Sequence, residues 1–133
     1  MRVALIGSRE YTNRRKIKKF IFKMKERFGD KLEIVSGGQK QGADGYAKKI
    51  SLEFDIKYAE FPPSHYQYNQ HCVEGSFNYG KKYAVWNYHK RNKQIVEYSD
   101  VVVAFIPEGH ESKGTLNTLE VAEKLEKKSI IID

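Results

Sequence analysis

The stretch Ser36-Gly37-Gly38-Gln39-Lys40-Gln41-Gly42-Ala43-Asp44 lies between an apolar run and a segment with helical periodicity. A strand, a glycine-rich turn and a helix start together form a common phosphate site. Glycines let the backbone approach the anion, and the free N–H groups of the first helical turn face it. The same residues also fit a plain tight turn, with Asp44 as a capping residue. The stretch alone leaves both interpretations open.

Strands alternate with helices along the chain. Apolar spacing predicts strands at 2–6, 33–36, 56–61, 101–106 and 129–132, and helices at 13–28, 43–54, 86–98 and 115–127. Such alternation is typical of crossover units, so we expect an α/β fold with a mainly parallel five-stranded sheet and helices on both faces. The wholly apolar run at 101–106 predicts the central strand. In the last helix, Leu116, Leu119, Ala122 and Leu125 are expected to face inward.

Residues 64–85 interrupt this alternation. They are rich in aromatic side chains and show no clean period. We interpret them as a long functional loop or a small insertion, because structureless loops of this length are uncommon inside compact domains. Most of the rings are expected to pack within the loop or at a subunit interface, and one or two to contact a ligand.

Size and composition indicate a single domain, residues 1–133, with an anionic partner. The net charge is +7 and the pI is near 9.4, which favours nucleotides or nucleic acid, although the lysines are scattered and also fit solvated helix faces. The lone cysteine, Cys72, suits a reducing cytosol, so we expect a cytoplasmic protein. No apolar run is long enough to span a membrane, so no membrane partner is expected. His71-Cys72 lacks a second pair of ligands, and no metal site is predicted.

Three turns follow predicted strands: Gly7-Ser8-Arg9, Ser36–Asp44 and residues 107–115. In an open parallel sheet, ligands bind outside the carboxyl ends of the strands, so we expect one pocket to collect these turns. Arg9 there would either pair with a phosphate or be an ordinary surface arginine. The familiar nucleotide signatures are absent. Ala43-Asp44 stands where a Walker A loop requires Lys and Ser or Thr, and no G-x-G-x-x-G follows the first strand.

Several short motifs are distributed over nearly the whole chain, in this order: Gly7-Ser8-Arg9, Ser36-Gly37-Gly38, Gly42-Ala43-Asp44, Arg91-Asn92, Ala104-Phe105, and Gly114-Thr115 with Ala122. In this order the chain resembles the YspA-like branch of the SLOG superfamily. That superfamily is a Rossmann-like set that also holds the Lonely-guy phosphoribohydrolases and the DprA-type DNA-binding domains. The resemblance implies a single Rossmann-like domain over residues 1–133, with an insertion at about 64–85, and a nucleotide or nucleotide-derived ligand.

The resemblance also implies the site residues and the partners. The expected ligand-binding residues are Gly7, Ser8, Arg9, Ser36, Gly37, Gly38, Gly42, Asp44, Arg91, Asn92, Gly114 and Thr115. Asp44 is expected to hydrogen-bond a ribose hydroxyl or to cap the loop. We expect no further cofactor. Paired subunits are common in the superfamily, so by analogy we expect a homo-oligomer.

One departure bears on catalysis. Lonely-guy enzymes carry Pro-Gly-Gly-x-Gly-Thr-x-x-Glu with a catalytic glutamate, and here Thr118 occupies the place of that glutamate. Cleavage of an N-glycosidic bond usually calls for a carboxylate. Glu108, Glu111 and Glu120 are candidates, and none is placed by the motif. We therefore expect a binding module that acts as a sensor or sequestering protein. The alternatives are an N-glycosidic hydrolase of nucleoside monophosphates, which leaves open whether the chain is an enzyme, and a binder of single-stranded nucleic acid as in DprA.

Overall fold

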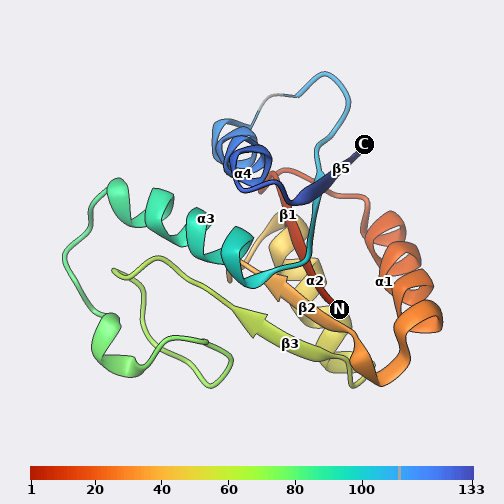
Figure 1. Ribbon diagram of the computed structural model, residues 1–133, viewed down its shortest axis with the longest axis horizontal. Helices are drawn as coiled ribbons and strands as arrows, with labels where there is room; N and C mark the ends of the chain where they lie inside the picture. The colour runs from red at the N-terminus through yellow and green to blue at the C-terminus, as the bar shows by residue number, and fades with distance from the viewer. Residues whose placement is uncertain (111) are drawn as a thin grey trace.

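The computed structural model describes residues 1–110 and 112–133. Its elements in chain order are β1 (Arg2–Gly7), α1 (Arg14–Phe28), η1 (Gly29–Lys31), β2 (Glu33–Ser36), α2 (Gly42–Glu53), β3 (Lys57–Glu60), η2 (Ser76–Asn78), α3 (Trp86–Tyr98), β4 (Val101–Phe105), α4 (Lys113–Lys124) and β5 (Lys128–Ile132). The strands form one parallel sheet in the order β3-β2-β1-β4-β5 (Figure 1). This arrangement confirms the predicted α/β fold with a five-stranded parallel sheet.

The central strand is β1, and the prediction that residues 101–106 form it is wrong. β1 pairs with β2 on one side and with β4 on the other, while β4 lies between β1 and the edge strand β5. An apolar run shows that helices cover both faces of a strand. It does not show how many strands lie beyond each side, and both β1 and β4 have buried residues on both faces.

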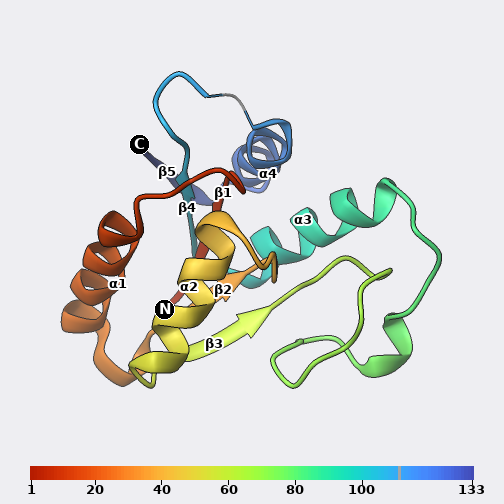
Figure 2. The same cartoon turned by 180° about the vertical axis from the view of Figure 1, so that it is seen from behind.

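Helices cover both faces of the sheet, as predicted, and the structure places two of them on each face. On one face, Ile17 and Ile21 of α1 and Ala47 and Ile50 of α2 pack against alternate residues of the strands. Figure 2 shows these two helices on the same side of the sheet. On the other face, α3 and α4 pack against the intervening strand residues through Ile95, Val96 and Ala122. The period-two alternation of a strand therefore divides the core into two layers.

The start and end of α1 follow from local sequence. The Asn13 side chain accepts a hydrogen bond from the backbone N–H of Lys16 at 3.2 Å, which caps the helix. Gly29, at φ 56°, ends the helix in a conformation that favours glycine.

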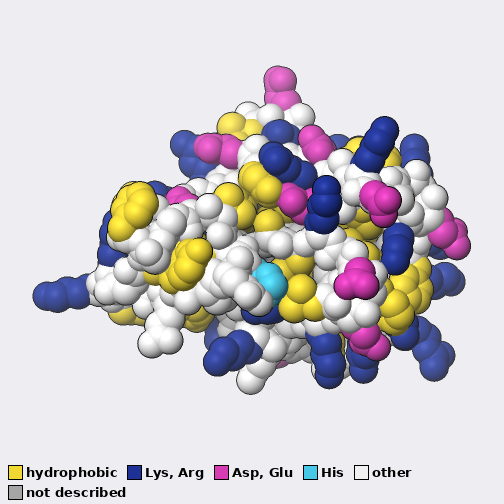
Figure 3. Space-filling view, turned by 90° about the horizontal axis from the view of Figure 1, so that it is seen from below, with side chains coloured by type: hydrophobic (Ala, Val, Ile, Leu, Met, Phe, Trp, Pro, Cys, Tyr) yellow, Lys and Arg dark blue, Asp and Glu magenta, His cyan; other side chains and the backbone are white. Residues whose placement is uncertain are grey.

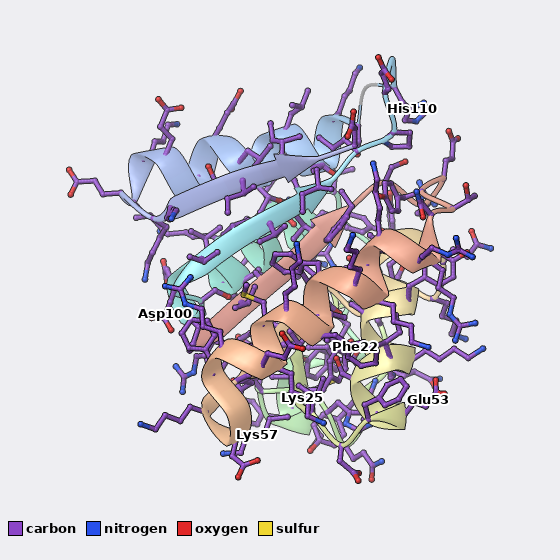
Figure 4. All side chains as sticks on the ribbon, turned by 90° about the vertical axis from the view of Figure 1, so that its right-hand side faces the viewer. Phe22, Lys25, Glu53, Lys57, Asp100 and His110 are labelled. Carbon is purple, nitrogen blue, oxygen red and sulfur yellow. The ribbon has the colours of Figure 1, made fainter. Side chains whose placement is uncertain are left out.

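Figure 4 looks onto α1 and shows Asp100 and His110 at opposite ends of β4. His110 therefore marks the edge of the sheet at which the strands end.

The inward face of α4 is narrower than its apolar spacing predicts. Ala122 is buried and Leu119 packs against the core, but Leu116 and Leu125 are exposed, which corrects the prediction for these two leucines. The cause is the position of α4 beside the edge strand. β5 has a neighbour on one side only and leaves Ile130 and Ile131 exposed. None of the helices among the described residues is long and apolar enough to cross a membrane.

The segment 61–85 joins β3 to α3 without a long helix or strand. It extends away from the sheet alongside α3 (Figure 1). Its first half is tied to the end of β3, because the Glu60 N–H donates to the His71 carbonyl at 3.0 Å and the Val73 N–H donates to the Glu60 carbonyl at 3.3 Å. The segment is therefore anchored beside the strand ends.

Candidate functional site

A cavity of about 250 Å³ lies where β1, β2 and β4 end. The structure brings residues from all three predicted turns to it, together with residues of α3. The predicted site residues that line it are Gly7, Arg9, Gly37, Asp44, Arg91, Asn92, Gly114 and Thr115. The other predicted residues, Ser8, Ser36, Gly38 and Gly42, lie outside this lining and support the turns.

The glycines of the loop after β2 allow very close backbone approach. A Cβ atom on Gly37 would collide with the Arg91 guanidinium and would lie 2.9 Å from Asp44 Oδ2. A Cβ atom on Gly42, where φ is +68°, would collide with the Ser8 carbonyl oxygen. Gly37 therefore leaves room for the charged groups of the cavity, and Gly42 lets the turns after β1 and β2 touch.

Two arginines, Arg9 and Arg91, line the cavity, and Arg91 is the less exposed of them. Its Nη1 donates to the Gly37 carbonyl at 2.8 Å and its Nε donates to Asn92 Oδ1 at 3.0 Å. Burial lowers the pKa of Arg91, and the nearby Asp44 carboxylate opposes that shift. An arginine keeps its charge in proteins and carries five N–H donors. The two bonds fix the guanidinium and leave donors available for an anion.

Asp44, in the first turn of α2, is the carboxylate that lines this cavity among the described residues. Burial raises the pKa of Asp44 to about 6, while Arg91 and the backbone N–H groups of Gln39 and Gly37 partly offset the rise. Asp44 Oδ2 accepts from the Gln39 N–H at 3.4 Å. The carboxyl group therefore stabilises the loop and changes charge near neutral pH.

The raised pKa makes a prediction about stability and pH. The folded protein holds the Asp44 proton more tightly than the unfolded chain, whose value is about 3.9. The contribution of Asp44 to stability is therefore full below about pH 4 and is lost as the pH rises through about 6. The Asp44→Asn variant has no carboxyl group to ionise and keeps its stability over this range. The difference in free energy of unfolding, variant minus wild type, should therefore increase by about 2–3 kcal/mol between pH 4 and pH 7. Urea unfolding across this range measures the difference. Asp30→Asn, at an exposed position, is the control, and equal pH profiles for wild type and Asp44→Asn would contradict the prediction.

The loop after β4 presents the N-terminus of α4 to the cavity. Ser112 caps this helix, since its Oγ accepts from the Thr115 N–H at 3.4 Å. Its hydroxyl also pairs with Thr115 Oγ1 at 2.9 Å, and Thr118 Oγ1 donates to the Gly114 carbonyl at 3.0 Å. Two helix N-termini, those of α2 and α4, thus contribute residues to one cavity, which favours an anion.

Tyr66 and Tyr88 also line the cavity and were not among the predicted site residues. Tyr88 was detectable from helical spacing, because residues 88, 91, 92 and 95 fall on one face of a helix and all of them line the cavity. Tyr66 carried no such signal, since it comes from an irregular segment. Gln39 and Ser112 belong to the predicted turns and were missed as individual residues, and Thr118 lies one turn further along α4 than the predicted Gly114 and Thr115.

Two of the three candidate catalytic glutamates, Glu108 and Glu120, do not line the cavity. Glu108 is exposed in the loop after β4. Glu120 is exposed and lines a separate hollow over α4 and β5. Glu111 lies outside the described residues. The described part of the chain also contains no group of three His, Cys, Asp or Glu side chains arranged to hold a metal ion.

A buried polar cluster supports the glycine loop from behind. The Glu60 side chain is 1% exposed and accepts hydrogen bonds from Lys48 Nζ at 3.2 Å and from the Tyr58 hydroxyl at 3.0 Å. The Tyr58 hydroxyl also bonds Ser36 Oγ at 2.6 Å, which in turn accepts from the Gly38 N–H at 3.2 Å. A chain of hydrogen bonds therefore runs from Glu60 to the loop.

Removal of the Tyr58 hydroxyl should interrupt this chain. We expect Tyr58→Phe to lower the free energy of unfolding by about 1–2 kcal/mol, because two buried polar partners lose a hydrogen bond. Tyr46→Phe is the matched control, since no hydrogen bond joins the Tyr46 hydroxyl to another described side chain or backbone group, and its effect should stay within about 0.5 kcal/mol. Denaturant unfolding of both variants measures the difference, and equal stabilities would show that the cluster does not support the fold.

The parallel sheet, the glycine-rich loop and the cavity at the strand ends define a Rossmann-like α/β domain with a candidate anion site. The model of the circularly permuted YpsA SLOG family matches residues 34–133. The chain belongs to this family, which confirms the resemblance to the SLOG superfamily. No curated protein matches the chain.

Two groups of solved structures share the fold. The molybdenum cofactor binding protein from the phototrophic bacterium Rippkaea orientalis has a TM-score of 0.70 and 19% identity, covering 98% of this chain and 74% of that one. The molybdenum cofactor carrier protein MCP from Chlamydomonas reinhardtii has a TM-score of 0.67 and 15% identity, with the same coverage of both chains. A second structure of the Chlamydomonas protein has a TM-score of 0.65. These similarities extend over nearly the whole chain and concern the fold.

Proposed function

We propose that this chain binds a phosphate-bearing nucleotide or nucleotide-derived small molecule in the cavity at the strand ends, as a sensor or sequestering module. The observation that carries the proposal is the convergence of the glycine loop, two helix N-termini and the half-buried Arg91 on one cavity. Each of these features favours an anion, and a tetrahedral phosphate can accept from several of them at once. Asp44 would then hydrogen-bond a sugar hydroxyl of the ligand.

The size of the cavity limits the ligand. Its volume of about 250 Å³ lies just below the range of about 300–1,000 Å³ that is typical for small-molecule sites. A mononucleotide or a compound of similar size suits this volume better than a dinucleotide. The proteins from Rippkaea and Chlamydomonas that share the fold are molybdenum cofactor proteins, so the molybdenum cofactor belongs among the ligands to be tested.

Hydrolysis of an N-glycosidic bond is the second candidate function, and Asp44 is the observation that favours it. Among the described residues it is the carboxylate in the cavity, and its pKa of about 6 would allow proton exchange near neutral pH. Nucleic-acid binding has less support. In Figure 3, Lys and Arg side chains are spread over the visible face among acidic and apolar ones and do not gather into one stripe.

A thermal-shift screen tests the proposal. The panel comprises AMP, GMP, ADP-ribose, a cyclic dinucleotide, the molybdenum cofactor and a short single strand, with products identified by mass spectrometry. Saturable stabilisation by an intact small phosphate compound is the expected result, because a ligand that prefers the folded state raises the melting temperature. Recovery of free base and ribose phosphate would instead establish the hydrolase. Stabilisation by the single strand alone, abolished by salt, would contradict a pocket ligand.

A further inference from the structure

We propose that Tyr66 and Tyr88 form a second subsite of the cavity, which stacks on the planar heterocycle of the ligand and selects base-bearing phosphates over simple sugar phosphates. This inference rests on the proposed function, because it concerns the other end of the same ligand. It assigns a role to the segment 61–85, which the phosphate site leaves unexplained.

Arg91 connects the two subsites. Its Nη1 donates to the carbonyl of Gly37 in the glycine loop, while its guanidinium carbon lies 5.7 Å from the centroid of the Tyr88 ring. The guanidinium therefore lies between the loop and the tyrosine. A ligand whose phosphate contacts the loop and Arg91 would extend its remaining atoms toward Tyr88 and Tyr66, both of which line the cavity.

His65 holds the two tyrosine rings in place. The centroid of its ring lies 4.9 Å from that of Tyr66 and 5.1 Å from that of Tyr88, both in edge-to-face geometry. Asn87 Nδ2 lies 3.3 Å from His65 Nδ1, and Asn87 is buried. The Gly80 N–H donates to the Tyr66 carbonyl at 3.3 Å, which links the two parts of the segment on either side of residues 67–79. The rings are thus arranged before a ligand arrives, which reduces the entropy lost on binding.

The chemistry of the two side chains suits a flat, polar heterocycle. Burial raises the pKa of Tyr88 to about 12, and the neighbouring Tyr66 adds to the rise, so the Tyr88 hydroxyl stays protonated at physiological pH. A neutral tyrosine offers a ring face for stacking and a hydroxyl that donates and accepts at the ring edge. Arg91 adds a planar cation that also stacks on aromatic rings.

Other rings of the segment lie outside the cavity. Phe77 is 84% exposed, Tyr83 68% and Tyr68 48%, and none of the three lines the cavity. Tyr68 instead pairs with Tyr79 at a centroid distance of 5.9 Å. Packing within the loop, which was expected for most of the rings, accounts for Tyr68 but not for the exposed Phe77, whereas Tyr66 and Tyr88 line the space that a ligand would fill. Tyr68 is therefore a matched control position in the same segment.

The test compares dissociation constants for AMP and ribose 5-phosphate by isothermal titration calorimetry. Wild-type protein should bind AMP about 10- to 100-fold more tightly, the range that stacking of one base supplies. Tyr66→Leu and Tyr88→Leu should each weaken AMP binding by about 10-fold and leave ribose 5-phosphate binding unchanged. Tyr88→Phe keeps the ring and should retain most of the preference, and Tyr68→Leu should behave as wild type.

The outcomes separate this inference from the proposed function. If wild-type protein binds neither compound, the proposed function is wrong. If it binds both equally, or if the leucine variants weaken both to the same extent, the phosphate site stands and the aromatic subsite is refuted. Circular dichroism detects a leucine variant that fails to fold. In that case the comparison of AMP with ribose 5-phosphate on the wild-type protein still tests the aromatic subsite, because it requires no variant.

Discussion

The Gly42→Ala variant is expected to lose about 3–4 kcal/mol of its free energy of unfolding. Alanine at a positive φ costs about 1–2 kcal/mol, and φ here is +68°. The added Cβ would also collide with the Ser8 carbonyl oxygen and lie 2.6 Å from the Arg9 Cα. These are backbone atoms of a neighbouring turn and cannot rotate away. Relief would require the turns after β1 and β2 to separate.

Gly114→Ala is the matched control for this prediction. Gly114 also lies in the first turn of a helix that borders the cavity, but a Cβ atom there has open space within 4 Å and φ is not positive. We expect its stability to match wild type or exceed it by up to about 1 kcal/mol, because alanine favours the helix. Chemical denaturation of the two variants gives the comparison. Equal losses at both positions would show that contact between the two turns does not stabilise the fold.

Replacement of Arg91 should have the largest effect on binding. We expect Arg91→Met to weaken the affinity for AMP by about 100- to 1,000-fold, since loss of one partner from a buried, hydrogen-bonded charge pair costs about 2–5 kcal/mol. Two effects combine. The phosphate loses the cation that is hydrogen-bonded to the glycine loop, and Asp44 loses the positive charge that favours its ionised form. Arg91→Lys keeps the charge but not the planar fork, so it should restore only part of the affinity.

Lys93→Met is the control for charge alone. Lys93 lies on the same helix, is exposed, and pairs only with Glu97 at 3.8 Å among the described residues. Its removal lowers the net charge by the same amount as the Arg91 variant, yet AMP affinity should change by less than about 3-fold. Calorimetric titration gives the dissociation constant of each variant for AMP, and circular dichroism checks that each variant is folded. Equal losses would mean that AMP binds through general surface charge and not through the cavity.

Most of the fold could be predicted from the sequence, because the patterns that determine helices and strands are local. The i, i+3, i+4 spacing of Ile17, Phe20 and Ile21 and the apolar runs of the strands determine the element types, and alternation of strand and helix favours a parallel sheet. The order of strands is not local. Both β1 and β4 are buried runs, and only the packing of the whole sheet places β1 at its centre.

The site was predictable to the extent that topology determines it. Parallel strands end at one edge of a sheet, so the turns at Gly7, Gly37 and Gly114 had to lie near one another. The contribution of Tyr66 was not predictable in this way, because residues 61–85 have no period and their path depends on tertiary contacts such as those between Glu60 and residues 71–73. The raised pKa of Asp44 likewise depends on burial, which no spacing reveals.

The most direct test of the central claim is a crystal structure of the protein with bound AMP. We expect the phosphate beside Gly37 and Arg91, at the N-termini of α2 and α4, with the adenine ring against Tyr66 or Tyr88. If the phosphate lies there but the base lies away from both tyrosines, the anion site is supported and the aromatic subsite is refuted. AMP bound in the hollow over α4 and β5, or on surface lysines with the cavity free of ligand, would contradict the account.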